Sequence, residues 1–406
     1  RYLGKKNYWV YIDKGNKEDI EENPNIPIAA RVGRMMSDHG EKIVKKVPIT
    51  SEEEAIGPQQ QFVTMNGKVY SLRFQEDFVD VSVKEVDLLN ELEVSKLYHC
   101  DGLVLCVGKD NSKLLLWNPY LCQTRLIGPR ESFHVTDRHA IGYDERRNHK
   151  ILRFVDNFIK NMNKIEVVYE IYEIRSDSWR VLEEVNPEGS IDTHQRGVSV
   201  KGNTYFVAYR NGLVQEVFLL CFDFTKERFG PRLHLPFDSF DGFNGDLVTL
   251  SSFLRGGDDE QLAVLFGGYE SGFFEIWVTL TVDPNRASWS KFLRMEPGPF
   301  SSYGFKLYSS LSGGSFFVDE ENKFAVLFEL YGTDTAHAAF VFGQDGFFKS
   351  SVNLGQALIL EHHHRKAARP PLVCSYRPSF VQVKHPLVHE RKMKDLSLLH
   401  ISKPMC

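Results

Sequence analysis

Long hydrophobic runs are missing from this chain of 406 residues. No stretch approaches the roughly 20 consecutive apolar residues that a membrane-spanning helix needs, and residues 1–30 hold no apolar core of a secretory signal. The glycosylation acceptor Asn-x-Ser/Thr is also absent. We therefore expect no membrane contact and a cytoplasmic or nuclear location, or both.

Cysteine is scarce, with six residues and no CxxC pair, so we expect reduced and mostly buried thiols. The sequence lacks GxxxxGK[ST], GxGxxG, GxSxG, HExxH and an EF-hand loop, which are common signatures of phosphate, dinucleotide, acyl and metal chemistry. The run His362–His364 has no carboxylate or thiolate at metal spacing, so a solvated loop explains it better than a metal site. We expect no catalytic residue, no cofactor and no metal.

Excess positive charge is absent as well, because the net charge is −5. This value argues against a general nucleic-acid binder. Two basic stretches, residues 138–150 and 362–369, are short and mixed with other residue types, so they are interpreted as solvated faces. The acidic stretches 258–260 and 319–321 are expected to be solvated turns.

Aromatic residues are abundant, at 13% of the chain, with 30 Phe and 16 Tyr. These residues favour strands, and they recur in a regular setting: an apolar strand, a turn of Asn, Asp, Gly, Pro or Lys, and a second strand. The recurring positions, at intervals of 47–63 residues, are Tyr70, Trp117, Tyr172, Phe222, Trp277 and Phe340. In the last five units the returning residue is expected at Thr124, Trp179, Phe229, Trp289 and Phe347.

Six units of about fifty residues, each with about four short strands, predict an all-β, six-bladed, kelch-like β-propeller over residues 62–383. A large β-sandwich is the alternative architecture. To close the ring, residues 374–376 and 379–383 should pair beside the first unit. Asn118-Pro119 should end the strand that carries Trp117, since proline cannot donate to a ladder.

The two ends of the chain differ in amino-acid composition from the repeats. Residues 1–61 are polar, charged and punctuated by proline, which is typical of a poorly ordered arm. Residues 384–406 form a short basic tail with a possible helix.

Several phrases, in one uninterrupted order over about residues 62–383, resemble the plant F-box-associated domain family. They include LYHCDGLVLC (97–106), HAIGYDERRNHKILRF (139–154), YEIRSDSWRVL (172–182), LLCFDFTKERFGPRLHLPF (219–237) and CSYRPSFVQV (374–383). The resemblance implies a substrate-recognition subunit of an SCF-type cullin ubiquitin ligase. In such a subunit an N-terminal F-box docks on the ligase's linker subunit and the propeller binds a protein substrate.

Only residues 42–56, KIVKKVPITSEEEAI, resemble the F-box, and the Arg/Cys/Trp half of that motif does not follow. Val47, Pro48 and Ile49 are the candidate residues for docking on the linker subunit, and a single apolar step predicts weak coupling. A chance match inside the arm is the other interpretation of this stretch.

Three hypotheses follow for the propeller: a ligase adaptor, a stand-alone protein-interaction propeller that has lost ligase coupling, and an enzyme with a site in the propeller mouth. For a binding role, the candidate recognition loops are residues 128–138, 186–196 and 238–246, because loops on a rigid scaffold usually carry recognition.

Overall fold

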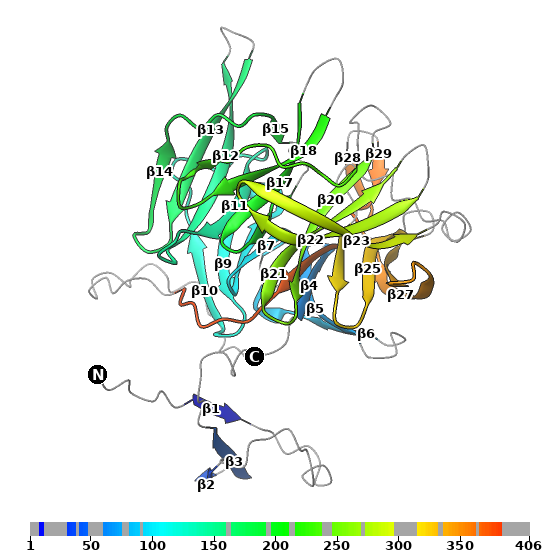
Figure 1. The fold of residues 1–406 in the computed structure, drawn as a ribbon. Coiled ribbons are helices and arrows are strands. Elements are labelled where there is room, and N and C mark those ends of the chain that lie inside the picture. The colour runs from blue at the N-terminus through cyan, green and yellow to red at the C-terminus, as the bar shows by residue number, and fades with distance from the viewer. Residues whose placement is uncertain are drawn as a thin grey trace. The chain divides into compact units, whose positions relative to one another are not determined.

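The computed structural model divides the chain into two compact units, Arg1–Pro58 and Gln59–Cys406 (Figure 1). The structure describes residues 8–11, 31–37, 40–47, 60–74, 81–89, 92–159, 164–191, 196–210, 216–237, 246–268, 273–295, 315–331, 336–362 and 365–383. Within these residues, no helix is both long enough and apolar enough to cross a membrane.

The first unit contains a three-stranded antiparallel sheet in the order β1-β3-β2. Its strands are β1 (Tyr8–Tyr11), β2 (Arg31–Ser37) and β3 (Gly40–Val47). Both outer strands pair with β3, as in Tyr8 opposite Val47 and Arg31 opposite Lys46. The expected arm of residues 1–61 therefore includes strands in its described part.

The second unit is built from six antiparallel sheets, which we number as blades in chain order. Blade 1 holds β30 (Leu372–Tyr376), β4 (Gln60–Met65), β5 (Lys68–Phe74) and β6 (Val81–Glu85). Blade 2 holds β7 (Val94–Cys100), β8 (Leu103–Gly108), β9 (Leu114–Asn118) and β10 (Gln123–Ile127). Blade 3 holds β11 (Arg138–Tyr143), β12 (His149–Ile159), β13 (Lys164–Glu173) and β14 (Ser178–Leu182).

Blade 4 has five strands, because two short strands, β15 (Ser190–Ile191) and β16 (Val198–Val200), both pair with β17 (Asn203–Arg210). Its last two strands are β18 (Glu216–Asp223) and β19 (Arg228–Phe229). Blade 5 holds β20 (Leu247–Arg255), β21 (Asp259–Gly267), β22 (Phe274–Asp283) and β23 (Arg286–Met295). Blade 6 holds β24 (Ser315–Asp319), β25 (Phe324–Tyr331), β26 (Ala336–Gly343) and β27 (Phe348–Gln356). A small hairpin of β28 (Leu360–His362) and β29 (Arg365–Ala367) precedes β30.

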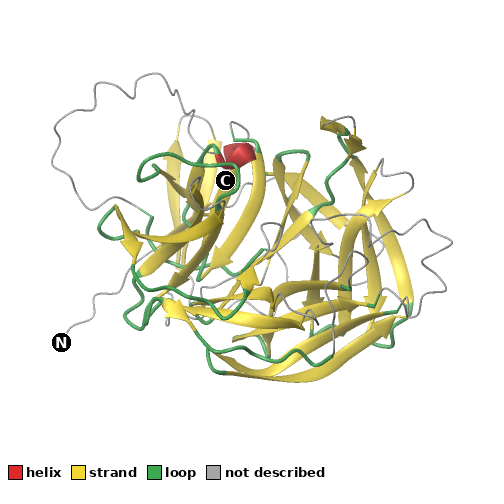
Figure 2. Cartoon of the chain, turned by 90° about the horizontal axis from the view of Figure 1, so that it is seen from above, coloured by secondary structure: helices red, strands yellow, loops and turns green. Residues whose placement is uncertain are grey.

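These six sheets form a ring, so the all-β, six-bladed propeller is confirmed. Helical residues are confined, in the described part of the second unit, to the short 3-10 turns Asp87–Leu89 and Lys109–Asn111 (Figure 2). Strand β4 begins at Gln60, two residues before the start expected for the domain.

The six recurring aromatic residues all lie in the third strand of their blades, which confirms their equivalence. Three of the expected return positions are also correct, since Thr124, Trp179 and Phe229 pair directly across from their partners. The two others are wrong. Trp277 lies opposite Lys291, and Trp289 lies opposite Thr279, because this hairpin turns between Asp283 and Arg286, closer to Trp289 than expected. Phe340 lies opposite Ser351. Phe347 falls in the turn and is 70% exposed.

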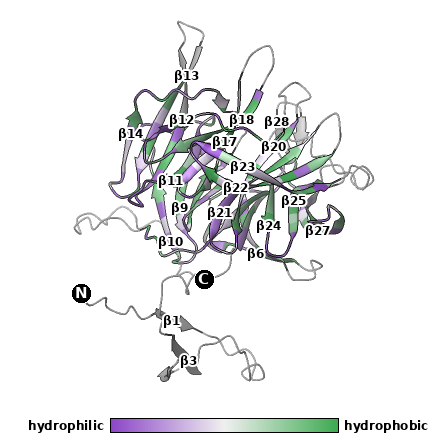
Figure 3. Ribbon diagram, viewed as in Figure 1, coloured by the Kyte–Doolittle hydropathy of each residue, from purple (hydrophilic) through white to green (hydrophobic). Residues whose placement is uncertain are grey.

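The hydrophobic core consists of separate clusters, one between each pair of neighbouring blades. The cluster between blades 3 and 4, for example, joins Phe154 and Ile171 to Phe206 and Phe222. Long stretches of the strands are accordingly hydrophobic, as the green ribbons of Figure 3 show. Because burying one large apolar side chain is worth about 1.5–3 kcal/mol, the contacts between blades are a main source of stability.

The ring is closed by β30, whose Cys374 lies opposite Phe62 of β4. The side chains reinforce this pairing: the Phe62 ring lies 5.2 Å from that of Tyr376 and 5.1 Å from that of Trp117 in blade 2. Pairing of residues 374–376 beside the first unit is thus confirmed.

Residues 379–383, expected to pair there too, form no strand. The Asn118 side chain holds this segment along blade 2 by donating from Nδ2 to the carbonyl oxygens of Ser379 (3.1 Å) and Val381 (2.8 Å). Strand β9 ends at Asn118 as expected, so the residue that stops the strand also binds the returning chain. Gly102, with φ +75°, permits the approach, because a Cβ there would lie 2.4 Å from the Ser379 Cβ.

The cysteines agree only in part with the expectation of reduced thiols. Cys100, Cys106, Cys221 and Cys374 are free and buried. Cys122 is disulfide-bonded, so the expectation is wrong at this position.

Acid should weaken the closure of the ring through His99. Its Nε2 accepts hydrogen bonds from the backbone N–H of Gly102 (3.0 Å) and of Arg377 (3.3 Å), the residue after β30. Burial lowers the pKa of His99 to about 4. Between pH 6.5 and 4, the His99 imidazole is therefore protonated in the unfolded chain but neutral in the folded chain. The free energy of unfolding consequently decreases as the pH falls through this window. We expect His99 to contribute up to about 1.4 kcal/mol per pH unit to that loss.

Denaturant unfolding across this pH range tests the expectation. His99→Gln should show a smaller loss of unfolding free energy per pH unit than the unchanged chain, while replacing the exposed His234 by Gln should not. Equal slopes for the two variants would show that His99 does not carry the effect.

Candidate recognition surface

The strand order gives the ring two different ends. Blades 2 to 6 begin with their innermost strand, and β30, antiparallel to β4, takes that place in blade 1. The innermost strands β7, β11, β16, β20, β24 and β30 therefore all start at the same end. We call this the loop end, because it holds the connections from each blade to the next and those between second and third strands. The other end, the turn end, holds the remaining turns. The hairpin β28–β29 lies at the loop end, which is the upper side of the ring in Figure 1.

In chain order, all three candidate recognition loops fall between the last strand of one blade and the first strand of the next. Residues 128–137 are fully described and lie at the loop end. Of 186–196, Ser190–Ile191 forms strand β15, Ile191 is buried, and residues 192–195 lie outside the described residues. Of 238–246, residues 238–245 lie outside the described residues.

The loop 128–137 is held rigidly by side chains from its neighbours. The Asn111 side chain donates from Nδ2 to the carbonyl oxygens of His134 (3.0 Å), Val135 (2.8 Å) and Asp137 (2.8 Å). At the start of the loop, the Trp179 indole N–H donates to the Gly128 carbonyl oxygen at 2.7 Å. The backbone of the loop is therefore fixed, while Val135 is 61% exposed at its surface.

Beneath the loop lies a buried cluster of charges centred on Arg153 of β12. Its guanidinium contacts the Asp137 carboxylate at 2.6 Å and the Glu170 carboxylate at 3.0 Å. These side chains are 3%, 0% and 9% exposed, respectively. Arg153 also donates to the Ser132 carbonyl oxygen and lies over the Phe133 ring. A buried pair of this kind contributes little net stability, but removing one partner leaves a charge uncompensated.

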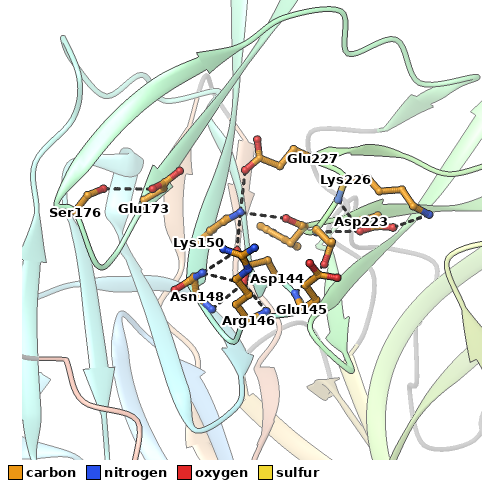
Figure 4. Close-up of polar contacts among 12 residues, drawn as sticks. Asp144, Glu145, Arg146, Asn148, Lys150, Glu173, Ser176, Asp223, Lys226 and Glu227 are labelled. Atoms are coloured by element: carbon orange, nitrogen blue, oxygen red, sulfur yellow. Dashed lines mark hydrogen bonds and ion pairs between the residues drawn. The ribbon is translucent and has the colours of Figure 1, made fainter.

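At the turn end a second polar cluster joins blades 3 and 4 (Figure 4). Lys150 contacts Asp144 at 3.1 Å and Glu227 at 2.9 Å, and Glu227 is bound in turn by Arg180. Burial would raise the pKa of Asp144, but hydrogen bonds from Asn148 and Lys150 outweigh it and lower that pKa to about 2. Each charge here is paired with another of the cluster, so the arrangement fastens two blades together and offers a ligand no open group.

The basic stretch 138–150 was expected to be a solvated face, and this is wrong for Arg138, His139, His149 and Lys150, which are buried. Sequence shows the charge of a stretch but not the partners, such as Asp144 and Glu227, that allow it to be buried. For the His362–His364 run, His362 lies in β28 and the other two residues lie outside the described residues. In the described part of the chain, no group of three or more His, Cys, Asp or Glu side chains could hold a metal ion.

The F-box-like residues are only partly described. Val47 is the last residue of β3, and Pro48 and Ile49 lie outside the described residues. Their role in docking stays a prediction.

Sequence reasoning missed a set of basic residues near the ring axis at the loop end. Each lies at or near the start of an innermost strand: Lys96 in β7, Arg138 in β11, Arg196 before β16 and Arg369 before β30. A basic residue at the same place in several repeats is a readable signal, but only once the innermost strands have been assigned.

Replacing Arg153 by Met should destabilise the protein by about 3–5 kcal/mol, because Asp137 and Glu170 would remain buried without their cation. Arg130 is the matched control. It contacts the same Glu170 at 3.2 Å but is 37% exposed, so Arg130→Met should cost under about 1 kcal/mol. Denaturant unfolding of both variants measures the difference, and equal losses would show that the buried cluster does not anchor the loop.

Comparison with known proteins agrees with this architecture. The family model of the F-box associated beta propeller domain matches residues 60–383. The F-box/kelch-repeat protein At1g24800 of Arabidopsis thaliana is 43% identical over 414 aligned residues, covering 88% of this chain and 92% of that protein. The F-box/kelch-repeat protein At3g13680 of the same plant is 44% identical, covering 79% of this chain and 83% of that protein.

Among solved structures, a chain of a nidogen/laminin complex is 12% identical with a TM-score of 0.41, over 78% of this chain and 98% of that chain. A likeness this distant carries no argument. The family model and the plant relatives, in contrast, cover most of the chain, and these relatives are 43% and 44% identical to it. The chain belongs to the F-box-associated β-propeller family.

Proposed function

We propose that the chain is a substrate-recognition subunit of an SCF-type cullin ubiquitin ligase. The observation that carries the proposal is the match of residues 60–383 to the F-box associated propeller domain, together with relatives that are F-box/kelch-repeat proteins. Its partners would be the ligase's linker subunit and a protein substrate, and its place of action the cytoplasm, the nucleus or both.

An adaptor of this kind needs no catalytic side chain of its own. It acts by holding a substrate lysine near the charged ubiquitin carrier, which raises the effective concentration of the two reactants. The loop end suits the task, because the loop 128–137 is fixed by Asn111 and Arg153 and still presents exposed side chains. A loop that is already ordered loses less conformational entropy when a partner binds.

A stand-alone interaction propeller is the second candidate, and one observation favours it. An F-box is a helical bundle, whereas residues 42–47 of the F-box-like stretch lie in strand β3. Such a protein would bind its partner through the same loop end without reaching the ligase.

Binding to the linker subunit distinguishes the two candidates. The full chain should bind weakly but measurably, and a chain that starts at Gln59 should not, because the first compact unit ends at Pro58. We expect weak binding because the three residues Val47-Pro48-Ile49 offer few of the contacts that a docking face needs. Calorimetry or surface plasmon resonance gives both affinities.

Point variants refine this experiment. Ile49→Ala should reduce the binding further, and Ser51→Ala, two residues away, is the matched control. If the full chain and the shortened chain both fail to bind, the adaptor proposal is wrong and the stand-alone propeller remains.

A further inference from the structure

The basic residues at the loop end, Lys96, Arg138, Arg196 and Arg369, form a group that the fold alone does not explain. We call this group the basic mouth. The four residues come from connections and strands of blades 1 to 4, yet the parallel innermost strands bring them to one end of the ring near its axis. Like charges placed together repel, so such a group destabilises the protein unless something negative offsets it.

Two of the arginines are fixed in place by backbone carbonyls. The Arg138 guanidinium donates to the Ile191 carbonyl oxygen at 2.6 Å and lies over the Phe154 ring, 5.1 Å from its centre. Arg196 donates through one terminal nitrogen to the Val373 carbonyl oxygen at 2.9 Å. Its other terminal nitrogen, Nη1, is buried and has no hydrogen-bond partner. A buried donor without an acceptor is costly, and an anion would supply the missing acceptor.

Three cations of the basic mouth, Lys96, Arg196 and Arg369, have no carboxylate partner among the described residues. Burial lowers the pKa of Lys96, and the nearby Arg196, Arg369 and Arg138 lower it further.

The opposite ends of the same strands behave differently. At the turn end, Arg147 is paired with Asp101, Arg255 with Glu320 and Arg377 with Asp258. Within the described residues, Lys96, Arg196 and Arg369 at the loop end thus differ from these three arginines, each of which has a carboxylate partner.

A cavity of about 130 Å³ adjoins the basic mouth. Arg369 lines it together with polar side chains such as Asn66 and Ser95 and the apolar side chain of Leu358. The one carboxylate of the lining, Glu93, is paired with Lys109 at 3.1 Å, so the charge of Arg369 is the one left for a ligand. Leu358 is 60% exposed, and its neighbour Ile359 is 50% exposed. A surface that combines cations, polar groups and exposed aliphatic side chains matches a peptide with acidic and apolar residues better than a bare inorganic anion. The net charge of −5 disfavours a long polyanion such as a nucleic acid.

We propose that the basic mouth binds an acidic segment of the protein partner, whose carboxylates contact Arg369, Lys96 and Arg196 while an apolar neighbour packs on Leu358. The inference rests on the proposed function in one respect only: it takes the partner to be a protein. The site would select an acidic segment over a neutral one, because a carboxylate accepts charge-assisted hydrogen bonds from these cations and a neutral side chain does not.

A fluorescein-labelled peptide of eight glutamates provides the test, with a peptide of eight glutamines as the uncharged reference. Fluorescence anisotropy should show that the full chain binds the glutamate peptide and not the glutamine peptide, with an affinity that falls as salt rises. Arg369→Glu should weaken binding roughly tenfold or more, since it replaces an attractive charge by a repulsive one. Arg369 is exposed, so the substitution should not disturb folding. Lys96→Gln should weaken binding as well.

Arg286→Glu is the matched control, because Arg286 is a 79% exposed arginine at the start of β23, next to a turn at the opposite end of the ring. It should leave the affinity for the glutamate peptide unchanged. Equal weakening by Arg369→Glu and Arg286→Glu, or no binding of the glutamate peptide at all, would overturn the proposal. So would displacement of the peptide by inorganic phosphate at the same concentration, since the mouth would then be a site for small anions.

This experiment contains neither the linker subunit nor ubiquitin, so its outcome is separate from that of the adaptor proposal. Binding of the linker subunit without binding of the glutamate peptide would support the adaptor proposal and contradict the proposed site for an acidic segment. The reverse result would leave an acidic-segment binder without a ligase.

Discussion

The pairing of β30 with β4 is the interaction on which the rest of the structure depends. It joins segments 314 residues apart, as in the hydrogen bond from Ser375 to Gln61, and supplies the innermost strand of blade 1. The core clusters on both sides of blade 1 include residues of β30, namely Val373 on one side and Cys374 and Tyr376 on the other. Closing so long a loop costs conformational entropy, and burial at these two interfaces offsets it.

A closed ring also determines where function can lie. Because each blade rests on its neighbours, the innermost strands stay parallel and every connection between blades reaches the loop end. The turn end is fastened by paired charges such as Lys150 with Asp144 and Glu227. The loop end instead combines an anchored loop, a small cavity and three cations, Lys96, Arg196 and Arg369, that form no ion pair with a carboxylate of the described residues. Recognition is expected at the end where polar groups still lack partners.

The fold could be predicted from the sequence because turn chemistry and aromatic strands repeat, which placed Trp117 and Tyr172 in equivalent third strands. The position of the turn before Trp289 and the exposure of Phe347 could not, since both depend on how the strands pair. Residues 128–138 were predicted as a recognition loop, but their anchor Arg153 was not, because the sequence gives no sign that this arginine is buried. Burial of that charge depends on Asp137 and Glu170, which only the folded ring brings to it.

Native-state hydrogen exchange of the full chain tests the closure of the ring most directly. If β30 closes the ring, the hydrogen-bonded amides of Leu372–Tyr376 should exchange as slowly as those of the buried strand β8, because both open only when the whole domain unfolds. Exchange of the β30 amides at the faster rate of the outer strand β6, with β8 still protected, would contradict this account, because the ring would then open at β30 without unfolding.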